Sequence, residues 1–223
     1  MRSVLFILAF VISSTAIAQK IEKKLGSFNQ LKTYDGLTIT LIPSKTNKAV
    51  ITGKYADKVQ LVTKNDLLKI KLNIEKYHSG KGTHVDLYYN HLYLIDANEG
   101  SFIKSNGVVE AIDLDINAQE GAEIDVTIKA KRLTARSISG ATIEISGNAT
   151  NQDITVNSGA NYHAKQLKSE QANINSSTGA MAKVYVTDVA KATVKTGGNI
   201  RIYGNPKVVD QKKILGGSIT IVD

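Results

Sequence analysis

The chain has 223 residues and no cysteine, which excludes disulfides, thiolate metal sites and cysteine nucleophiles. Its formal net charge of +8 is unevenly placed: residues 19–84 hold 13 lysines against 5 acidic residues, whereas residues 85–223 hold 14 basic and 15 acidic residues. The basic segment could bind acidic glycans, anionic lipid head groups or nucleic acid. We favour lysines that protect an exposed β edge from pairing, because they alternate along strand-like segments instead of clustering.

Residues 1–18 have the composition of a secretory signal peptide. Arg2 supplies a positive charge, Val4 to Ile12 form an apolar run, and Ala16-Ile17-Ala18 is a small-residue cleavage site. The run is short for a membrane span, and no second hydrophobic segment follows. We therefore predict a mature chain that begins at Gln19, with no stable membrane insertion. The expected location is the periplasm, the cell surface or the extracellular space.

Residues 28–91 predict an N-terminal cap and the first strands of the mature domain. Phe28 is the first large apolar residue and is expected to anchor the cap. Apolar residues then alternate with polar ones, a pattern typical of strands with one buried face. They are Leu37, Ile39, Leu41, Leu68, Ile70, Leu72 and Ile74.

Residues 92–221 contain a regular repeat centred on glycine. Intervals of 21, 19, 19, 20, 18 and 19 residues separate Gly100, Gly121, Gly140, Gly159, Gly179, Gly197 and Gly216. Apolar residues alternate with polar ones on both sides of each glycine, so each repeat is a strand, a tight turn and a second strand. A period near 20 residues is typical of a solenoid. A β-sandwich also has short strands and glycine turns, but it would not keep one pattern through six intervals.

We therefore predict an all-β fold, a parallel β-helix solenoid of about 19–20-residue coils with an N-terminal β-rich cap. It forms a single domain over residues 19–223. The glycine is expected at a tight corner that requires a positive φ. Further apolar residues between the turns are expected to point inward, namely Ile128, Leu133, Leu167 and Val186.

The recurring turns resemble those of a known bacterial family. Ser139-Gly140-Ala141 and Ser158-Gly159-Ala160, with Phe28, the strand Leu37 to Ile42 and the closing Tyr203-Gly204-Asn205-Pro206, are similar to the head GIN domain. The resemblance covers about residues 28–221. It implies a β-helix, export and a role resembling that of autotransporter adhesins. Many members have an aspartate in the turn, and this chain has none there.

Two groups of side chains are candidates for chemistry. Asp113, Asp115, Glu123 and Asp125 form the densest acidic segment, and basic residues follow at Lys129, Lys131, Arg132 and Arg136. Some β-helix enzymes use such a combination to bind calcium and cleave acidic polysaccharides, but the same charges could simply pair on a solvated face. The four histidines have no metal-site spacing and are expected on the surface. They are His78, His84, His91 and His163.

Tyr88, Tyr89 and Tyr93 cluster after the basic segment. They could form a sugar-binding surface together with the lysines, or they could cap the solenoid core, which we favour. Asn157 and Asn175 are expected to stack near the corners. No serine has a histidine and an acid at a recognisable spacing.

We predict no catalytic, metal or cofactor site. The favoured function is an exported, non-catalytic binding or structural module, adhesin-like, at the cell envelope or surface. Its expected partner is an acidic glycan or another envelope component, not nucleic acid, and no oligomeric state is predicted. The alternative is a polysaccharide-active lyase or hydrolase with an acidic site on the outer face. Convergence of acidic and basic groups in one groove, with shifted pKa values, would favour the enzyme.

Overall fold

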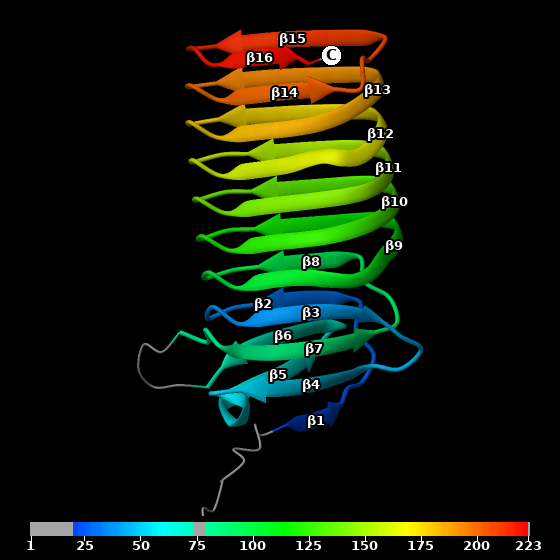
Figure 1. Cartoon of the computed structure of the whole chain (residues 1–223), viewed down its shortest axis with the longest axis vertical. Coiled ribbons are helices and arrows are strands. Elements are labelled where there is room, and N and C mark those ends of the chain that lie inside the picture. Colours follow the sequence, from blue (N-terminus) through cyan, green and yellow to red (C-terminus); the bar gives the residue numbers. More distant parts are fainter. Residues whose placement is uncertain (1–19, 74–78, 223) are drawn as a thin grey trace, which may run out of the picture.

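A computed structural model describes residues 20–73 and 79–222, and the predicted signal peptide lies outside this range. The described chain forms a parallel β-solenoid (Figure 1), which confirms the predicted fold class. The first elements are β1 (Ile21–Lys24), β2 (Gln30–Thr33), β3 (Thr38–Pro43), β4 (Lys48–Gly53), a 3-10 turn (Ala56–Lys58), β5 (Val59–Lys64), β6 (Leu67–Leu72), β7 (Thr83–Tyr89) and β8 (Leu94–Ala97). The remaining strands are β9 (Phe102–Ala118), β10 (Glu123–Ser137), β11 (Thr142–Val156), β12 (Asn161–Ser177), β13 (Met181–Lys195), β14 (Asn199–Tyr203), β15 (Val208–Ile214) and β16 (Ser218–Ile221).

Each long strand from β9 to β13 runs along one side of the solenoid, bends, and returns along the other side (Figure 1). Successive strands pair in parallel, as β10 does with β11 from Glu123 and Thr142 to Ser137 and Val156. The outer surface of the first halves, together with β3, β7, β14 and β16, is called the front face here. The back face is the outer surface of the second halves, together with β2, β6, β8 and β15.

The N-terminal strands do not follow the order of the sequence. The coil made by β2 and β3 lies between the coil of β6 and β7 and the coil of β8 and β9, because β2 pairs with β6 and β8 while β3 pairs with β7 and β9. Antiparallel β4 and β1 then follow β7 at the end of the stack, and antiparallel β5 follows β6. The end of the solenoid is thus covered by strands of opposite direction.

Apolar side chains fill the interior in columns. The predicted inward residues Ile128, Leu133, Leu167 and Val186 are all at most 1% exposed, as expected. Phe28 is buried as well, at the capped end. Stacking of equivalent residues at the inter-strand spacing therefore takes the place of a globular core. No helix among the described residues is long and apolar enough to cross a membrane.

The tight corners share one backbone geometry. Ser139 and Gly140 both have positive φ, at 52° and 73°, and Ala141 N–H donates to Ile138 C=O at 3.2 Å. Gly140 N–H donates to Ser158 C=O of the next corner at 3.1 Å, and the same bond recurs from corner to corner. Asp35 and Gly36, between β2 and β3, have the same geometry, with φ of 62° and 67°. The first coil therefore uses the same turn, although its Asp-Gly-Leu sequence falls outside the repeat.

The wide bends are irregular, in contrast to the corners. Strands β9 and β12 have 17 residues where β10, β11 and β13 have 15. The additional residues form bulges, seen as register shifts after Ala164 in β12 and opposite Val126 in β9. Bulges re-aim side chains and are frequent beside functional sites. The bulge in β12 leads to the candidate site.

Candidate functional site

The predicted acidic segment is divided between the two faces of the solenoid. Asp113 and Asp115 lie on the back half of β9, whereas Glu123 and Asp125 lie on the front half of β10, beyond the corner at Gly121. The expectation that these four carboxylates share one outer surface is therefore wrong, because a tight corner reverses the chain between them. The carboxylate of Asp113 forms an ion pair with Arg132, whose Nη2 donates a hydrogen bond to Asp113 Oδ2 at 2.7 Å.

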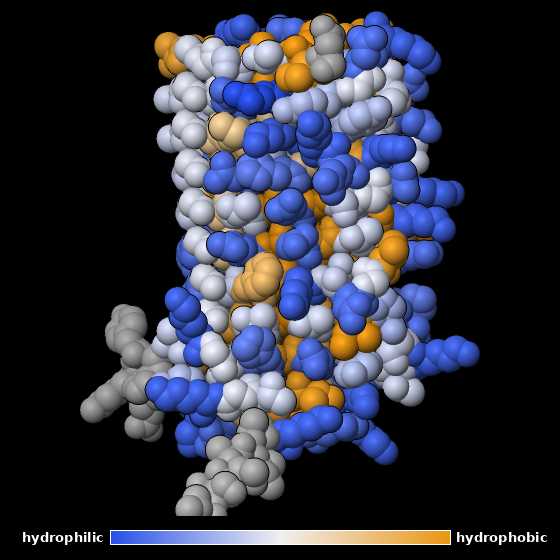
Figure 2. Space-filling model, viewed as in Figure 1, coloured by the Kyte–Doolittle hydropathy of each residue, from blue (hydrophilic) through white to orange (hydrophobic). Residues whose placement is uncertain are grey.

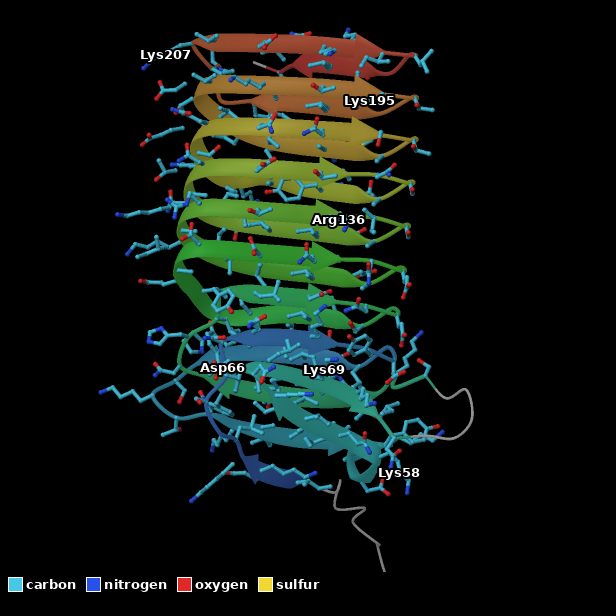
Figure 3. The ribbon with its side chains drawn as sticks, turned by 180° about the vertical axis from the view of Figure 1, so that it is seen from behind. Lys58, Asp66, Lys69, Arg136, Lys195 and Lys207 are labelled. Atoms are coloured by element: carbon cyan, nitrogen blue, oxygen red, sulfur yellow. The ribbon has the colours of Figure 1, made fainter. Side chains whose placement is uncertain are left out.

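The predicted basic residues at this level are also dispersed. Lys129 lies at the bend and pairs with Glu110 at 3.7 Å, and Arg136 points outward from the back face (Figure 3). Lys131 is exposed between them. The arrangement is a solvated face with weak ion pairs. It is not the composite acidic site of the alternative prediction.

The N-terminal tyrosines do not form a shared surface either. Tyr89 is 3% exposed, and burial raises its pKa to about 12. Tyr88 lies outside, with Lys48 Nζ 4.7 Å from the ring centroid, and Tyr93 is 42% exposed. Tyr89 thus contributes to the core of the cap, as the favoured interpretation predicted for alternating members of this group.

The N-terminal lysines are also spread over several elements. Lys69 is exposed on β6, while Lys58 lies at the lower end of the molecule (Figure 3) and pairs with Asp57 at 3.0 Å. Lys54 Nζ lies 4.9 Å from the ring centroid of Tyr55. Lys32, the β2 neighbour of Lys69, pairs with Asp96 at 2.9 Å. These cations do not converge on one groove.

Two of the remaining predictions concern asparagine and histidine. Asn157 lies at a corner and accepts a hydrogen bond from Ser177 Oγ at 3.0 Å, whereas Asn175 occupies a different column, between Thr155 and Thr193. The two asparagines therefore do not stack. His84 and His91 are exposed, and His78 lies outside the described residues. Within the described ranges, no group of three or more His, Cys, Asp or Glu could hold a metal ion.

His163 belongs to an outward column on the front face. Parallel register places Asp125 beside Glu144, Glu144 beside His163, His163 beside Lys183, and Lys183 beside Arg201. The column is thus acidic toward β10, basic toward β14 and has an imidazole between the two. Burial and then the charge of Lys183 lower the pKa of His163, against the opposing effect of Glu144. The imidazole is therefore neutral at pH 7.

Beside this column, the bulge in β12 turns two consecutive side chains outward. Lys165 and Gln166 are both exposed and interrupt the alternation of β12. Together with the column from Asp125 to Lys183 they line a depression of about 250 Å³. Lys165 also lines the neighbouring depression, of about 480 Å³, with Tyr185, Tyr203 and Asn205. We call the two depressions, joined at Lys165, the front groove.

Two tyrosines form the aromatic part of the front groove. Tyr185 and Tyr203 are register partners on β13 and β14, and both are half-buried. Lys165 Nζ lies 4.8 Å from the ring centroid of Tyr203, a cation–π contact. A Cβ atom on Gly204 would come within 2.8 Å of Tyr185 Cε1, so the Tyr185 ring rests directly against the Gly204 backbone. Backbone shape therefore fixes the ring.

A buried polar network lies beneath the bulge. The fully buried Tyr162 donates its hydroxyl to Gln152 Oε1 at 2.8 Å, and Gln152 Nε2 donates to Ser169 Oγ at 2.7 Å. Ser169 Oγ then donates to the carbonyl oxygen of Tyr185 at 2.7 Å. The widened coil thus has a tyrosine and a polar network inside it, and the network reaches the strand that carries the Tyr185 ring.

Figure 2 shows the front face, where hydrophilic side chains predominate and hydrophobic ones are visible between them, many of them along the middle of the face. The front groove is open, with charged and polar side chains around His163 and the two tyrosine rings at its other end, and it does not form an enclosed cavity of the kind that would surround an acyl chain. Sequence reasoning did not find this groove. Its signal was the spacing: the 21- and 20-residue intervals are the two longest, and they contain the bulged strands β9 and β12.

Comparisons with known proteins agree with this architecture. A family model described as "Putative auto-transporter adhesin, head GIN domain" matches residues 27–206. The chain belongs to the head GIN domain family. No curated protein matches the sequence of this head GIN domain.

Solved structures show the same fold at low sequence identity. A putative adhesin from Bacteroides fragilis is 17% identical with a TM-score of 0.86, over 93% of this chain and 98% of that chain. A putative adhesin from Parabacteroides merdae is 20% identical with a TM-score of 0.74, over 94% and 98%. A putative lipid binding protein from Parabacteroides distasonis is 15% identical with a TM-score of 0.75, over 94% and 98%. At these identities the likeness extends to the fold of the head GIN domain alone.

Proposed function

We propose that this chain is an exported, non-catalytic, adhesin-like module that binds carbohydrate of the cell envelope or cell surface in the front groove. The carrying observation is the Tyr185 and Tyr203 pair, which lies in an open depression beside a bulged strand that re-aims Lys165. Aromatic rings pack well against the C–H face of a sugar ring. The surrounding lysine, amide and imidazole groups could bond to its hydroxyls.

Two observations support export: residues 1–18 have the composition of a signal peptide, and the chain belongs to a family that is described as an auto-transporter adhesin domain. The front groove is open to water and combines aromatic rings with charged and amide side chains, which favours a hydrated ligand over an acyl chain. One of the solved structures with the same fold is a putative lipid binding protein, so lipid is the competing ligand to test.

The enzyme hypothesis keeps one supporting observation. Asp125, Glu144 and His163 are consecutive in the front column, so two carboxylates and a neutral imidazole converge there. Paired carboxylates can cleave glycosidic bonds when their pKa values differ. An open groove on a flat sheet surrounds a substrate poorly. We therefore assign these groups to binding.

Glycan-array binding of the purified protein tests the proposal, with Tyr185→Ala and Tyr203→Ala as variants and Tyr93→Ala as the exposed-tyrosine control. We expect selective glycan binding that both groove variants weaken about tenfold and the control leaves unchanged. Binding to phospholipid vesicles without glycan binding would instead favour a lipid ligand. Release of shortened saccharide, lost in Glu144→Gln, would overturn the non-catalytic assignment.

A further inference from the structure

Positive charge is in excess where the front groove approaches β14. Lys165 and Lys183 line the groove, and Arg201, which lines neither depression, is adjacent to Lys183 in the outward column. None of the three forms an ion pair with any residue that the structure describes. Like charges directly adjacent on a sheet oppose folding. Their placement is therefore unfavourable unless an anion joins them.

Some cations elsewhere on the solenoid have an acidic partner on a neighbouring coil. Lys207 pairs with Asp188 at 2.6 Å, and Arg132 pairs with Asp113 across neighbouring coils. In the front column, the acidic residues that could have neutralised Lys183 lie on the far side of His163. The lowered pKa of His163 leaves that separator uncharged near neutral pH. Charge is thus segregated along the groove, with the tyrosines at its basic end.

We infer that the front groove binds an anionic saccharide, with the sugar ring against Tyr185 and Tyr203 and its carboxylate or sulfate held by Lys165, Lys183 and Arg201. This assignment rests on the proposed carbohydrate-binding function and adds the ligand class to it. Lys165 is the link between the two parts, because its ammonium group contacts the Tyr203 ring and lines both depressions. An anion at this position gains charge-assisted hydrogen bonds from all three cations.

The tyrosine rings and the cations together fit an anionic saccharide better than they fit two simpler ligands. A neutral saccharide could pack on the tyrosines, but it would leave the cations unpaired. An acidic polypeptide could satisfy the cations, but it has no ring of C–H groups to lie on the aromatic surface. The expected order of affinity is therefore a carboxylated polysaccharide first, with its uncharged ester and a polyanion without sugar rings both weaker.

Binding titrations of the purified protein can test this order with three matched polymers: polygalacturonate, its methyl ester and poly-L-glutamate. The double variant Lys183→Gln with Arg201→Gln removes the two adjacent charges. The control is Arg136→Gln with Lys195→Gln, which removes the same two residue types from the back face, where both are exposed (Figure 3). Far-ultraviolet circular dichroism confirms that each variant is folded.

We expect polygalacturonate to bind at least tenfold more tightly than either other polymer. The groove double variant should weaken that binding by tenfold or more, and the back-face control by less than twofold. Equal binding of the ester, unaffected by the groove variant, would overturn the anionic assignment while leaving carbohydrate binding intact. Equal binding of poly-L-glutamate would show that charge alone is recognised. If no saccharide binds, the proposed function and this inference both fail.

Discussion

The corners and the bends of the solenoid follow different rules. At the corners from Asp35-Gly36 to Leu215-Gly216 the backbone has the same pair of positive φ values, while the residue before the glycine is Asp, Glu, Ser, Thr or Leu. At the bends the strand lengths differ, β9 and β12 are bulged, and the side chains that β12 turns outward line the front groove. Regularity at one edge holds the coils in register. The other edge can therefore change without loss of the fold.

The largest expected difference is in the cost of replacing a glycine at a corner and a glycine near a bend. A Cβ on Gly140 at a corner has no atom within 4 Å, so Gly140→Ala suffers only from its positive φ and should cost about 1 kcal/mol. A Cβ on Gly147 near the bend would lie 2.1 Å from Ile128 O at a φ of 107°. Gly147→Ala must move the backbone as well and should cost about 3 kcal/mol.

Thermal and urea unfolding of both variants measure the difference. Equal losses would mean that backbone conformation alone, and not the close stacking of coils, makes glycine necessary at both edges. A larger loss at Gly140 would contradict the open space at the corners.

The edges also differ in how far the sequence predicted them. The corners repeat a residue type at a fixed spacing, so their glycines, inward residues and parallel stacking followed from the pattern. The bulge in β12 depends on the fit between Tyr162, Gln152 and the neighbouring coils, which no local pattern contains. The position of β2 between β6 and β8 could not be predicted either, because short strands with similar alternating patterns can pair in more than one order.

The candidate site shows the same limit. His163 was correctly expected to point outward, but its neighbours Glu144 and Lys183 come from two other coils, about 19 residues away in each direction. Asp115 and Glu123 are close in sequence but lie on opposite faces, because a corner separates them. In a solenoid, surface patches form along columns across coils. A charge map must therefore be drawn in the repeat register.

A second prediction concerns the network under the bulge. Tyr162→Phe removes the hydroxyl that donates to the buried Gln152, leaving an unpaired carbonyl, and should cost about 1–3 kcal/mol. Tyr89→Phe is the matched control, since the Tyr89 hydroxyl is buried and has no hydrogen-bond partner in the described part of the chain. That change should be neutral or slightly stabilising at pH 7.

Denaturant unfolding of the two tyrosine variants gives the comparison directly. The same chemical change is expected to destabilise the chain only at Tyr162, because only Tyr162 has a hydrogen-bond partner to lose. If Tyr162→Phe were as harmless as Tyr89→Phe, the polar network would not support the widened coil. The bulge would then need another cause, such as the two additional residues alone.

The smallest effect is expected at a corner where carboxylates meet. Burial, followed by the nearby Asp35, raises the pKa of Glu99, whose corner lies between those of Asp35 and Glu120. A carboxyl group with a raised pKa in the folded chain contributes its stability below the pKa of the unfolded chain, and that contribution is lost as the pH rises through the folded value. At pH 7 the ionised Glu99 therefore opposes folding, although solvent screens most of the effect because the residue is exposed.

Glu99→Gln should accordingly raise the free energy of unfolding at pH 7 by less than about 1 kcal/mol. It should change that free energy little at pH 3, where the carboxyl is protonated in both the folded and the unfolded chain. The corner hydrogen bond is unaffected, because Gly36 N–H donates to the main-chain carbonyl of Glu99. Thermal unfolding of the parent and the variant at the two pH values separates charge from packing. A gain of equal size at pH 3 would mean that the side chain matters through its shape, and a loss at pH 7 would mean that Glu99 has a stabilising partner.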